Sequence, residues 1–226
     1  MAIKPILFNT EMVRAILDGR KSCTRRIVKP QQLIGMLPDK CKNGVPEEFL
    51  KEKKLMFKPY CDMTDIELIN TAYKAPYQPG DIMYVRETWQ YLYELDGNEQ
   101  VIEDTGKYYY AATDTIPFNT YVDKNGVEHD HAPWKPSIHM PKEAARIWLK
   151  VTDVRVERLQ EITSEQICRE GVEVEYPHVL NGEEKRYAFS TLWNSTIKKS
   201  DLDRYGWDAN PWVWIIEFDR CEKPEE

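Results

Sequence analysis

The sequence predicts an α+β protein with one domain, residues 1–226, made of strands, flanking helices and two long insertions. Apolar residues alternate at every second position in several short runs and recur at helical spacing beside capping residues in others. Two polar segments, at about 31–79 and 91–141, show neither period over any length. A chain of 226 residues is long enough to bury a core.

The first helix is predicted at residues 10–17. Thr10 stands where an N-cap is expected, apolar residues follow at helical spacing, and Gly19 is placed to stop the helix. A strand at 23–28 comes next, with Lys21 in the turn that precedes it.

The two insertions surround a second predicted strand, at 82–89. The insertion at 31–79 has a candidate surface helix at 47–55 and otherwise has the composition of a solvated loop. The insertion at 91–141 contains a strand signal at 108–112 and a hairpin turn at 123–126, so we expect it to form its own small sheet.

The last third of the chain contains a capping box, with Thr163 at the N-cap and Gln166 three residues later. It predicts a helix that Gly171 closes, with Glu170 on the last turn. Three further elements follow from the same periods: a strand at 145–156, a helix at 188–198 and a strand at 212–220.

The segment 17–26 concentrates cations and hydroxyls at the exit of the first helix. Its cations and hydroxyl groups belong to Arg20, Lys21, Ser22, Thr24, Arg25 and Arg26. This density is typical of a binding or catalytic site. A basic run after a helix is also explained by compensation of the helix dipole in a solvated turn.

Composition excludes several classes of function. The chain has 31 basic and 38 acidic residues, a net charge of −7, so we expect no bulk, non-specific DNA binding. Five cysteines without a CxxC pair, a start without a signal peptide and the lack of any long apolar run predict a cytoplasmic protein without membrane contact. Nothing in the sequence indicates an oligomeric state.

The sequence predicts neither a metal site nor a cofactor. Four residues superficially suggest a metal site, but they stand in a polar insertion without a helical HExxH context or cysteine partners: His129, Asp130, His131 and His139. There is no P-loop and no GxGxxG after a strand.

Several segments in combination resemble the ASCH-domain family. They are 17–26, 79–81, 86–89 and 159–163. Residues 134–141 and 206–214 add a closer resemblance to its phage- and prophage-encoded branch. The family adopts a PUA-like β-barrel, so the resemblance implies such a barrel, with flanking helices and the two insertions.

The resemblance also implies a chemistry. Small members of the family are amidohydrolases that act on N4-acetylcytidine, and others are proposed to bind or cut RNA. Their working groups correspond here to Lys21, Thr24 and Glu170. Amide hydrolysis needs a nucleophile, a base and an acid for the departing amine, and these residue types can supply them. Ser22 remains a rival nucleophile.

Seven residues are candidates for substrate binding: Arg20, Ser22, Arg26, Glu87, Trp89, Trp207 and Asn210. Arginines can steady an oxyanion, aromatic rings can stack on a base, and an asparagine can read a base edge. The structural alternatives are an ion pair with an arginine for Glu87, a solvent-facing helix position for Glu170, and the protein core for Trp212 and Trp214.

Together these observations predict recognition of a nucleobase, a nucleoside or RNA in a basic cleft, with or without amide hydrolysis of an acylated nucleoside. The competing hypothesis is a non-catalytic RNA-binding module or a phage accessory protein.

Overall fold

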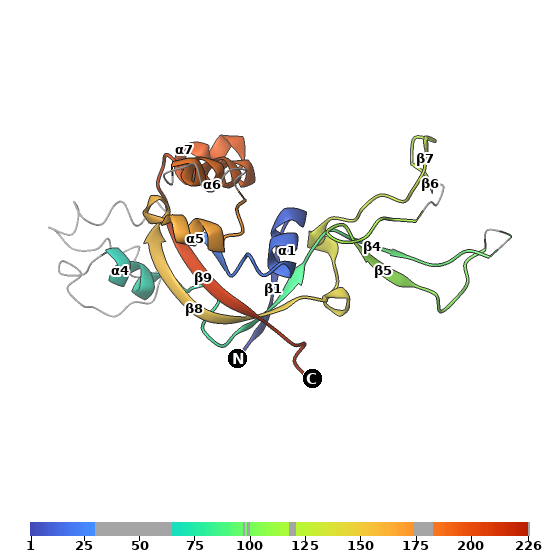
Figure 1. The fold of residues 1–226 in the computed structure, drawn as a ribbon, viewed down its shortest axis with the longest axis horizontal. Helices are drawn as coiled ribbons and strands as arrows, with labels where there is room; N and C mark the ends of the chain where they lie inside the picture. The colour runs from blue at the N-terminus through green and yellow to red at the C-terminus, as the bar shows by residue number, and fades with distance from the viewer. Residues whose placement is uncertain (30–64, 97, 99, 118–120, 174–182, 226) are drawn as a thin grey trace. The chain divides into compact units, whose positions relative to one another are not determined.

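The computed structural model describes residues 1–29, 65–96, 98, 100–117, 121–173 and 183–225, which form a mixed arrangement of strands and helices (Figure 1). The chain divides into two compact units. The first comprises Met1–Lys21, Gly80–Lys150 and Asp219–Glu226, and the second comprises Ser22–Pro79 and Val151–Phe218. A mixed α and β fold is confirmed, whereas the single domain and the closed barrel stay predictions. The helix predicted at 47–55 lies outside the described residues.

In the first unit, β1 (Ile3–Leu7) pairs in parallel with β3 (Ile82–Arg86). The other edge of β3 pairs antiparallel with the first residues of β8 (Trp148–Arg158). The strand predicted at 82–89 is wrong at its end. The chain leaves the ladder at Glu87, and Trp89 begins a separate strand.

Helix α1 (Thr10–Leu17) is present as predicted, but its N-cap is Asn9 and not Thr10. The backbone of Asn9 is extended, and its Oδ1 accepts a hydrogen bond from the Met12 N–H at 2.9 Å. Asparagine is among the strongest N-cap residues, which explains the shift by one position. Gly19 follows the end of α1 with φ +73°, a left-handed conformation that glycine adopts with little strain.

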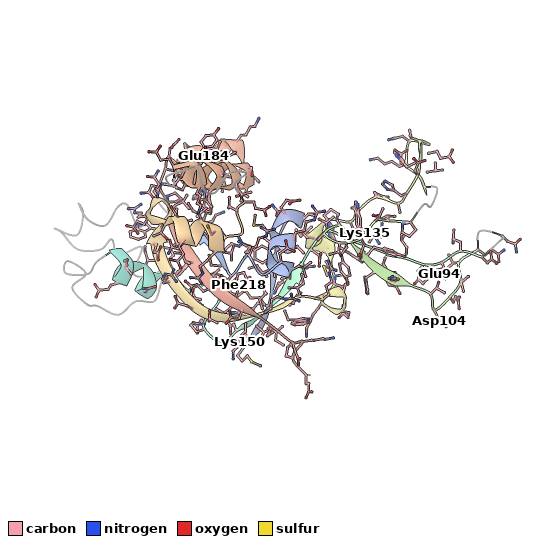
Figure 2. The ribbon with its side chains drawn as sticks, viewed as in Figure 1. Glu94, Asp104, Lys135, Lys150, Glu184 and Phe218 are labelled. Atoms are coloured by element: carbon pink, nitrogen blue, oxygen red, sulfur yellow. The ribbon has the colours of Figure 1, made fainter. Side chains whose placement is uncertain are left out.

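The insertion at 91–141 forms small sheets of its own, as predicted. Strand β4 (Trp89–Leu92) pairs with β5 (Lys107–Tyr110), and β6 (Tyr121–Val122) pairs with β7 (Glu128–His129). The Gly126 N–H donates to the Asp123 carbonyl at 2.9 Å, which confirms the predicted hairpin turn. Figure 2 shows Glu94 and Asp104 beyond the end of the β4–β5 ribbon that lies away from Lys135.

In the second unit, β2 (Cys23–Ile27) pairs antiparallel with β9 (Trp212–Cys221). Figure 1 shows β9 beside the long strand β8. The strand predicted at 212–220 is therefore confirmed. Strand β8 starts later than the predicted residue 145, because the 3-10 turn η5 (Lys142–Ala144) and an irregular segment precede it, and it ends later, at Arg158.

The described part of the second unit contains the helices α4 (Asp65–Ala72), α5 (Ser164–Arg169), α6 (Glu183–Thr196) and α7 (Leu202–Tyr205), with short 3-10 turns η6 (Leu159–Glu161) and η7 (Lys199–Asp201). The capping box of α5 is confirmed, since Thr163 and Gln166 exchange both of its hydrogen bonds. Helix α6 starts at Glu183 and not at 188. Two glutamates fill its first turn, where the helix dipole favours negative charge.

Strand β9 is buried on both of its faces. Trp212 and Trp214 belong to a cluster with Ile69 of α4, whereas Val213 and Ile215 belong to a cluster with Phe189 of α6. Successive side chains of a strand point to opposite faces, so β9 separates a cluster on the side of α4 from a cluster on the side of α6. Strand β2 pairs with β9, so its side chains alternate between the same two faces.

Candidate functional site

The basic motif is divided by the pleat of β2. Thr24 and Arg26 share one face of the strand, and Cys23 and Arg25 share the other. The structure pairs Arg26 with Trp214 across the two strands, and it pairs Arg25 with Ile215. Two arginines that are adjacent in sequence are thus placed in different surroundings.

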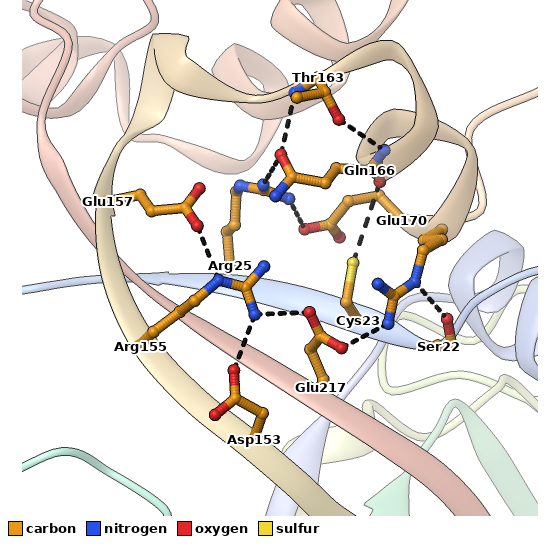
Figure 3. Close-up of polar contacts among 11 residues, drawn as sticks. Ser22, Cys23, Arg25, Asp153, Arg155, Glu157, Thr163, Gln166, Glu170 and Glu217 are labelled. Carbon is orange, nitrogen blue, oxygen red and sulfur yellow. Dashed lines mark hydrogen bonds and ion pairs between the residues drawn. The ribbon is translucent and has the colours of Figure 1, made fainter.

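Arg25 forms a buried ion pair. Its Nη1 donates to Glu170 Oε1 at 2.9 Å and its Nη2 donates to Gln166 Oε1 at 3.1 Å (Figure 3). The side chains of Arg25 and Glu170 are only 1% and 7% exposed. A solvent-facing position for Glu170 is therefore wrong. The carboxylate is the counter-charge of a buried arginine.

A second polar network surrounds Glu217 of β9. This carboxylate accepts hydrogen bonds from Arg169 Nη2 at 2.6 Å and from Arg155 Nη1 (Figure 3). Burial favours the protonated acid, but the two guanidinium groups outweigh it and hold the pKa of Glu217 below its ordinary value. Arg155 also binds Asp153 and Glu157.

Ser22 joins this second network. Its Oγ accepts a hydrogen bond from Arg169 Nε at 3.2 Å, and its N–H donates to the Arg169 carbonyl at 2.9 Å. The rival nucleophile is thus tied to the C-terminal turn of α5.

Arg26 is held on the opposite face of β2. Its Nη1 donates to Thr24 Oγ1 at 3.0 Å and to the Arg25 carbonyl at 3.2 Å. Burial lowers the pKa of the Arg26 guanidinium, and the nearby Glu170 and Tyr77 act against that shift. An arginine stays protonated in proteins, so Arg26 presents an oriented positive charge.

This face of β2 opens onto a cleft in the second unit, here called the Arg26 cleft. It consists of two adjoining cavities of about 470 and 540 Å³ that share four lining residues: Tyr73, Lys74, Tyr77 and Trp214. Arg26 and Lys29 complete the polar lining of the smaller cavity. Volumes of this size are typical of small-molecule sites.

The sequence did not identify most of this lining. Tyr73, Lys74 and Tyr77 fall in the insertion that was predicted to be a solvated loop, and Trp214 was assigned to the core. Trp214 is indeed buried, at 5% exposure, but it also forms a wall of the cleft. Two tyrosines four residues apart beside a lysine were the local signal that could have indicated a site.

The predicted site residues of the first unit lie in separate surroundings. Lys21 is buried, with Nζ 5.6 Å from the centroid of the Phe8 ring. Arg20 pairs with Asp18 at 2.9 Å. Lys21 belongs to the first unit and Thr24 and Glu170 to the second, so their joint action stays a prediction.

Glu87 and Trp89 have structural partners in the first unit. Arg146 binds both oxygens of Glu87 at 2.9 Å, which is the ion pair that the sequence left as the alternative. The Trp89 ring packs in the core cluster with Met140, under the ammonium of Lys135 at 5.0 Å from its centroid. A role of either residue in substrate binding stays a prediction.

Trp207 and Asn210 stabilise the loop before β9. Asn210 Oδ1 accepts a hydrogen bond from the Gln160 N–H at 2.8 Å, and Gln160 Nε2 donates to the Trp207 carbonyl at 2.9 Å. The Trp207 ring meets Phe189 edge-on at 6.0 Å. The acceptor oxygen of Asn210 is therefore already used within the protein.

His129 and its acidic neighbours line a cavity of about 680 Å³ beside the β6–β7 turn. His129 Nε2 lies 3.5 Å from Asp123 Oδ2. Within the described ranges, no three His, Cys, Asp or Glu side chains are grouped so that they could hold a metal ion. None of the helices in these ranges combines the length and the apolar character needed to cross a membrane.

Comparison with known proteins gives little beyond these observations. No family model matches the chain, and no curated protein does. Among solved structures the chain is similar to an ASCH domain from Lactobacillus crispatus JV V101, at 10% sequence identity and a TM-score of 0.34. The likeness covers 97% of this chain and 79% of that chain. At this identity and TM-score, it indicates neither an activity nor the residues that would perform it.

Proposed function

We propose that the Arg26 cleft binds a nucleobase, presented as part of a nucleoside or of RNA. The observation that carries the proposal is the placement of Arg26 beside Trp214, with Tyr73 and Tyr77 lining the same cavities. Aromatic rings stack on bases, and a guanidinium can both stack on a base and donate to its acceptor edge. Thr24 and the Arg25 carbonyl hold that guanidinium in one orientation.

The family proposal rests on the sequence motifs. We propose that the chain is an ASCH-type protein of the phage and prophage branch, with a PUA-like barrel, acting in the cytoplasm. Support comes from the combination of segments 17–26, 79–81, 86–89 and 159–163, and from the scattered cysteines, which suit a reducing compartment.

Amide hydrolysis of an acylated nucleoside is the second candidate function. One contact favours it: Arg26 Nη1 donates to Thr24 Oγ1 at 3.0 Å, which would stabilise negative charge on that oxygen during attack. In this proposal Thr24 Oγ1 attacks the acetyl carbonyl and Lys21 takes the hydroxyl proton. Glu170 gives a proton to the departing amine of cytidine as the amide C–N bond breaks, and a water molecule then releases acetate from Thr24.

Binding is tested by titrating the protein with the four ribonucleosides and with a short single-stranded RNA while its tryptophan fluorescence is followed. We expect binding that Arg26→Gln weakens by about tenfold or more, as loss of an oriented, charged hydrogen-bond donor does. Arg220→Gln is the matched control, because Arg220 is exposed on β9 and lines neither cavity. Equal loss in both variants, or no binding to the wild type, would contradict the proposal.

Hydrolysis is tested separately by incubating the wild type with N4-acetylcytidine and analysing the products by mass spectrometry. We expect release of acetate that Thr24→Val and Lys21→Ala each abolish, while Ser22→Ala retains it. An intact substrate together with retained nucleoside or RNA binding would leave a recognition module without this activity.

A further inference from the structure

The lining of the Arg26 cleft differs in charge from the rest of the chain. The ionised side chains among its described lining residues are all cations: Arg26, Lys29 and Lys74. Among the described residues that line the two cavities there is no aspartate or glutamate, although the whole sequence has seven more acidic than basic residues. A local excess of positive charge beside aromatic rings is typical of sites that accept phosphorylated ligands.

The two lysines lie at positions where a phosphate could reach them. Lys29 and Lys74 are both exposed, and Lys74 forms no ion pair with any residue that the structure describes. Lys29 Nζ lies 5.1 Å from the centroid of the Tyr205 ring, a cation–π contact. Arg26, in contrast, is partly buried and is oriented by Thr24.

The shape of the cleft gives room for more than a base. Its two cavities share Tyr73, Lys74, Tyr77 and Trp214, so a ligand can extend from one to the other past Lys74. The second cavity adds neutral polar groups, Asn70 and Gln78, which can bind a ribose or an ester oxygen.

We propose that the Arg26 cleft binds its ligand through a phosphate as well as a base, so that it prefers nucleotides and single-stranded RNA over free nucleosides. Lys29 and Lys74 contact phosphate oxygens, and Arg26 and the aromatic rings contact the base. This proposal rests on the proposed function, because it concerns the same cleft.

The test compares three classes of probe under one condition: ribonucleosides, their 5′-monophosphates, and a single-stranded RNA of mixed sequence. We expect each monophosphate to bind about tenfold or more tightly than its nucleoside, since two or three charge-assisted contacts are added. RNA that binds more tightly than the monophosphates identifies a polymer ligand, and equal binding identifies a free nucleotide.

Lys74→Gln and Lys29→Gln probe the phosphate contacts directly. We expect each to weaken binding of the RNA by about three- to fivefold and to reduce the slope of log K against log salt by about 0.7. Nucleoside binding should not change. Lys199→Gln is the matched control, because Lys199 is an exposed lysine of the same unit that lines neither cavity.

The outcomes separate this proposal from the one on which it rests. Nucleosides that bind as tightly as monophosphates, with both lysine variants unchanged, would overturn the phosphate contacts and leave base recognition standing. Inorganic tripolyphosphate that competes as well as a nucleotide would show an anion site without base recognition and would overturn both proposals. Failure of every nucleoside, nucleotide and RNA to bind would also overturn both.

Discussion

Arg25 and Arg26 show how one strand places two adjacent arginines in different surroundings. Arg25 faces the side of α6, where Glu170 neutralises its charge out of contact with water. Arg26 faces the cleft, where its charge is oriented by Thr24 and remains next to a cavity. The same residue type is therefore structural at one position and a binding candidate at the next, because successive side chains of a strand point to opposite faces.

The buried Arg25–Glu170 ion pair is expected to contribute to the free energy of unfolding. Glu170→Gln leaves a guanidinium buried without its counter-charge, so we expect the free energy of unfolding to fall by roughly 3–5 kcal/mol. Urea denaturation of the two proteins measures the difference. The matched control is Glu165→Gln, an exposed position on the same helix, where a loss below about 1 kcal/mol is expected from the helix dipole. Similar losses in the two variants would contradict a stabilising role for the pair.

Tyr110 of β5 is expected to make the stability of the protein depend on pH in the alkaline range. Burial raises the pKa of its hydroxyl to about 12, with Arg146 acting against the shift and Glu87 adding to it. An unfolded tyrosine titrates near pH 10. The folded state therefore holds this proton more firmly, and the resulting stability is complete below about pH 10 and is lost as the pH rises through about 12.

The variant Tyr110→Phe isolates this effect. It removes the hydrogen bond from the hydroxyl to the Ala144 carbonyl at 2.7 Å, so it should be less stable than the wild type near pH 9. We expect the difference in unfolding free energy to shrink between about pH 10 and 12 as the wild type loses its advantage. Urea denaturation across this range measures it. A difference that stays constant with pH would be the contrary result.

At the scale of the element, α5 depends on its capping box, and the box also reaches Arg25. Gln166 Oε1 accepts one hydrogen bond from the Thr163 N–H at 2.9 Å and another from Arg25 at 3.1 Å. The N-terminal turn of the helix and the buried ion pair thus share one amide oxygen. A substitution at the N-cap is therefore expected to weaken the hydrogen bond between Gln166 and Arg25 of β2 as well.

We therefore expect Thr163→Ala to lower the free energy of unfolding by about 1 kcal/mol, the usual cost of removing a threonine N-cap. Thr163→Ser is the matched control, because it keeps the hydroxyl that accepts from the Gln166 N–H at 3.2 Å. Thermal unfolding of the three proteins checks the order. If serine proves as damaging as alanine, the hydroxyl is not what stabilises this turn.

Elements with a strong local signal were predictable from the sequence. The capping box of α5, the turn at 123–126 and the strand β9 are fixed by neighbours within a few residues. The sequence predictions were wrong where the end of an element depends on a residue far away in the sequence. Strand β3 ends at Arg86 because the chain turns to other partners, and Glu87 is then held by Arg146, 59 residues away.

The Arg26 cleft was not predictable for the same reason. Its walls come from β2, from the segment after α4 and from β9, which are far apart in sequence. The motif that contains Arg26 was recognised from its local density of charge and hydroxyl groups. Its aromatic partners carry no such signal, because a tyrosine or a tryptophan in a cavity wall has the same local pattern as one in the core.

At the scale of the whole molecule, charge distribution sets what can bind. The chain carries a net charge of −7, so a polyanion is repelled on average and attracted only where cations gather. The described lining of the Arg26 cleft gathers three cations and contains no carboxylate. Specific recognition of a nucleic acid is then possible without general adhesion to nucleic acids.

This contrast predicts a strong preference for single strands over duplex DNA. A base must leave its stack to enter a cavity lined by Trp214 and Tyr77, and a duplex offers phosphates but no unstacked base. We expect that a large excess of duplex DNA will not displace a labelled single-stranded RNA from the wild type, as measured by fluorescence anisotropy. The unlabelled RNA is the control competitor. Displacement by the duplex at similar nucleotide concentrations would mean that phosphate attraction outside the cleft governs binding, against the distribution of charge described above.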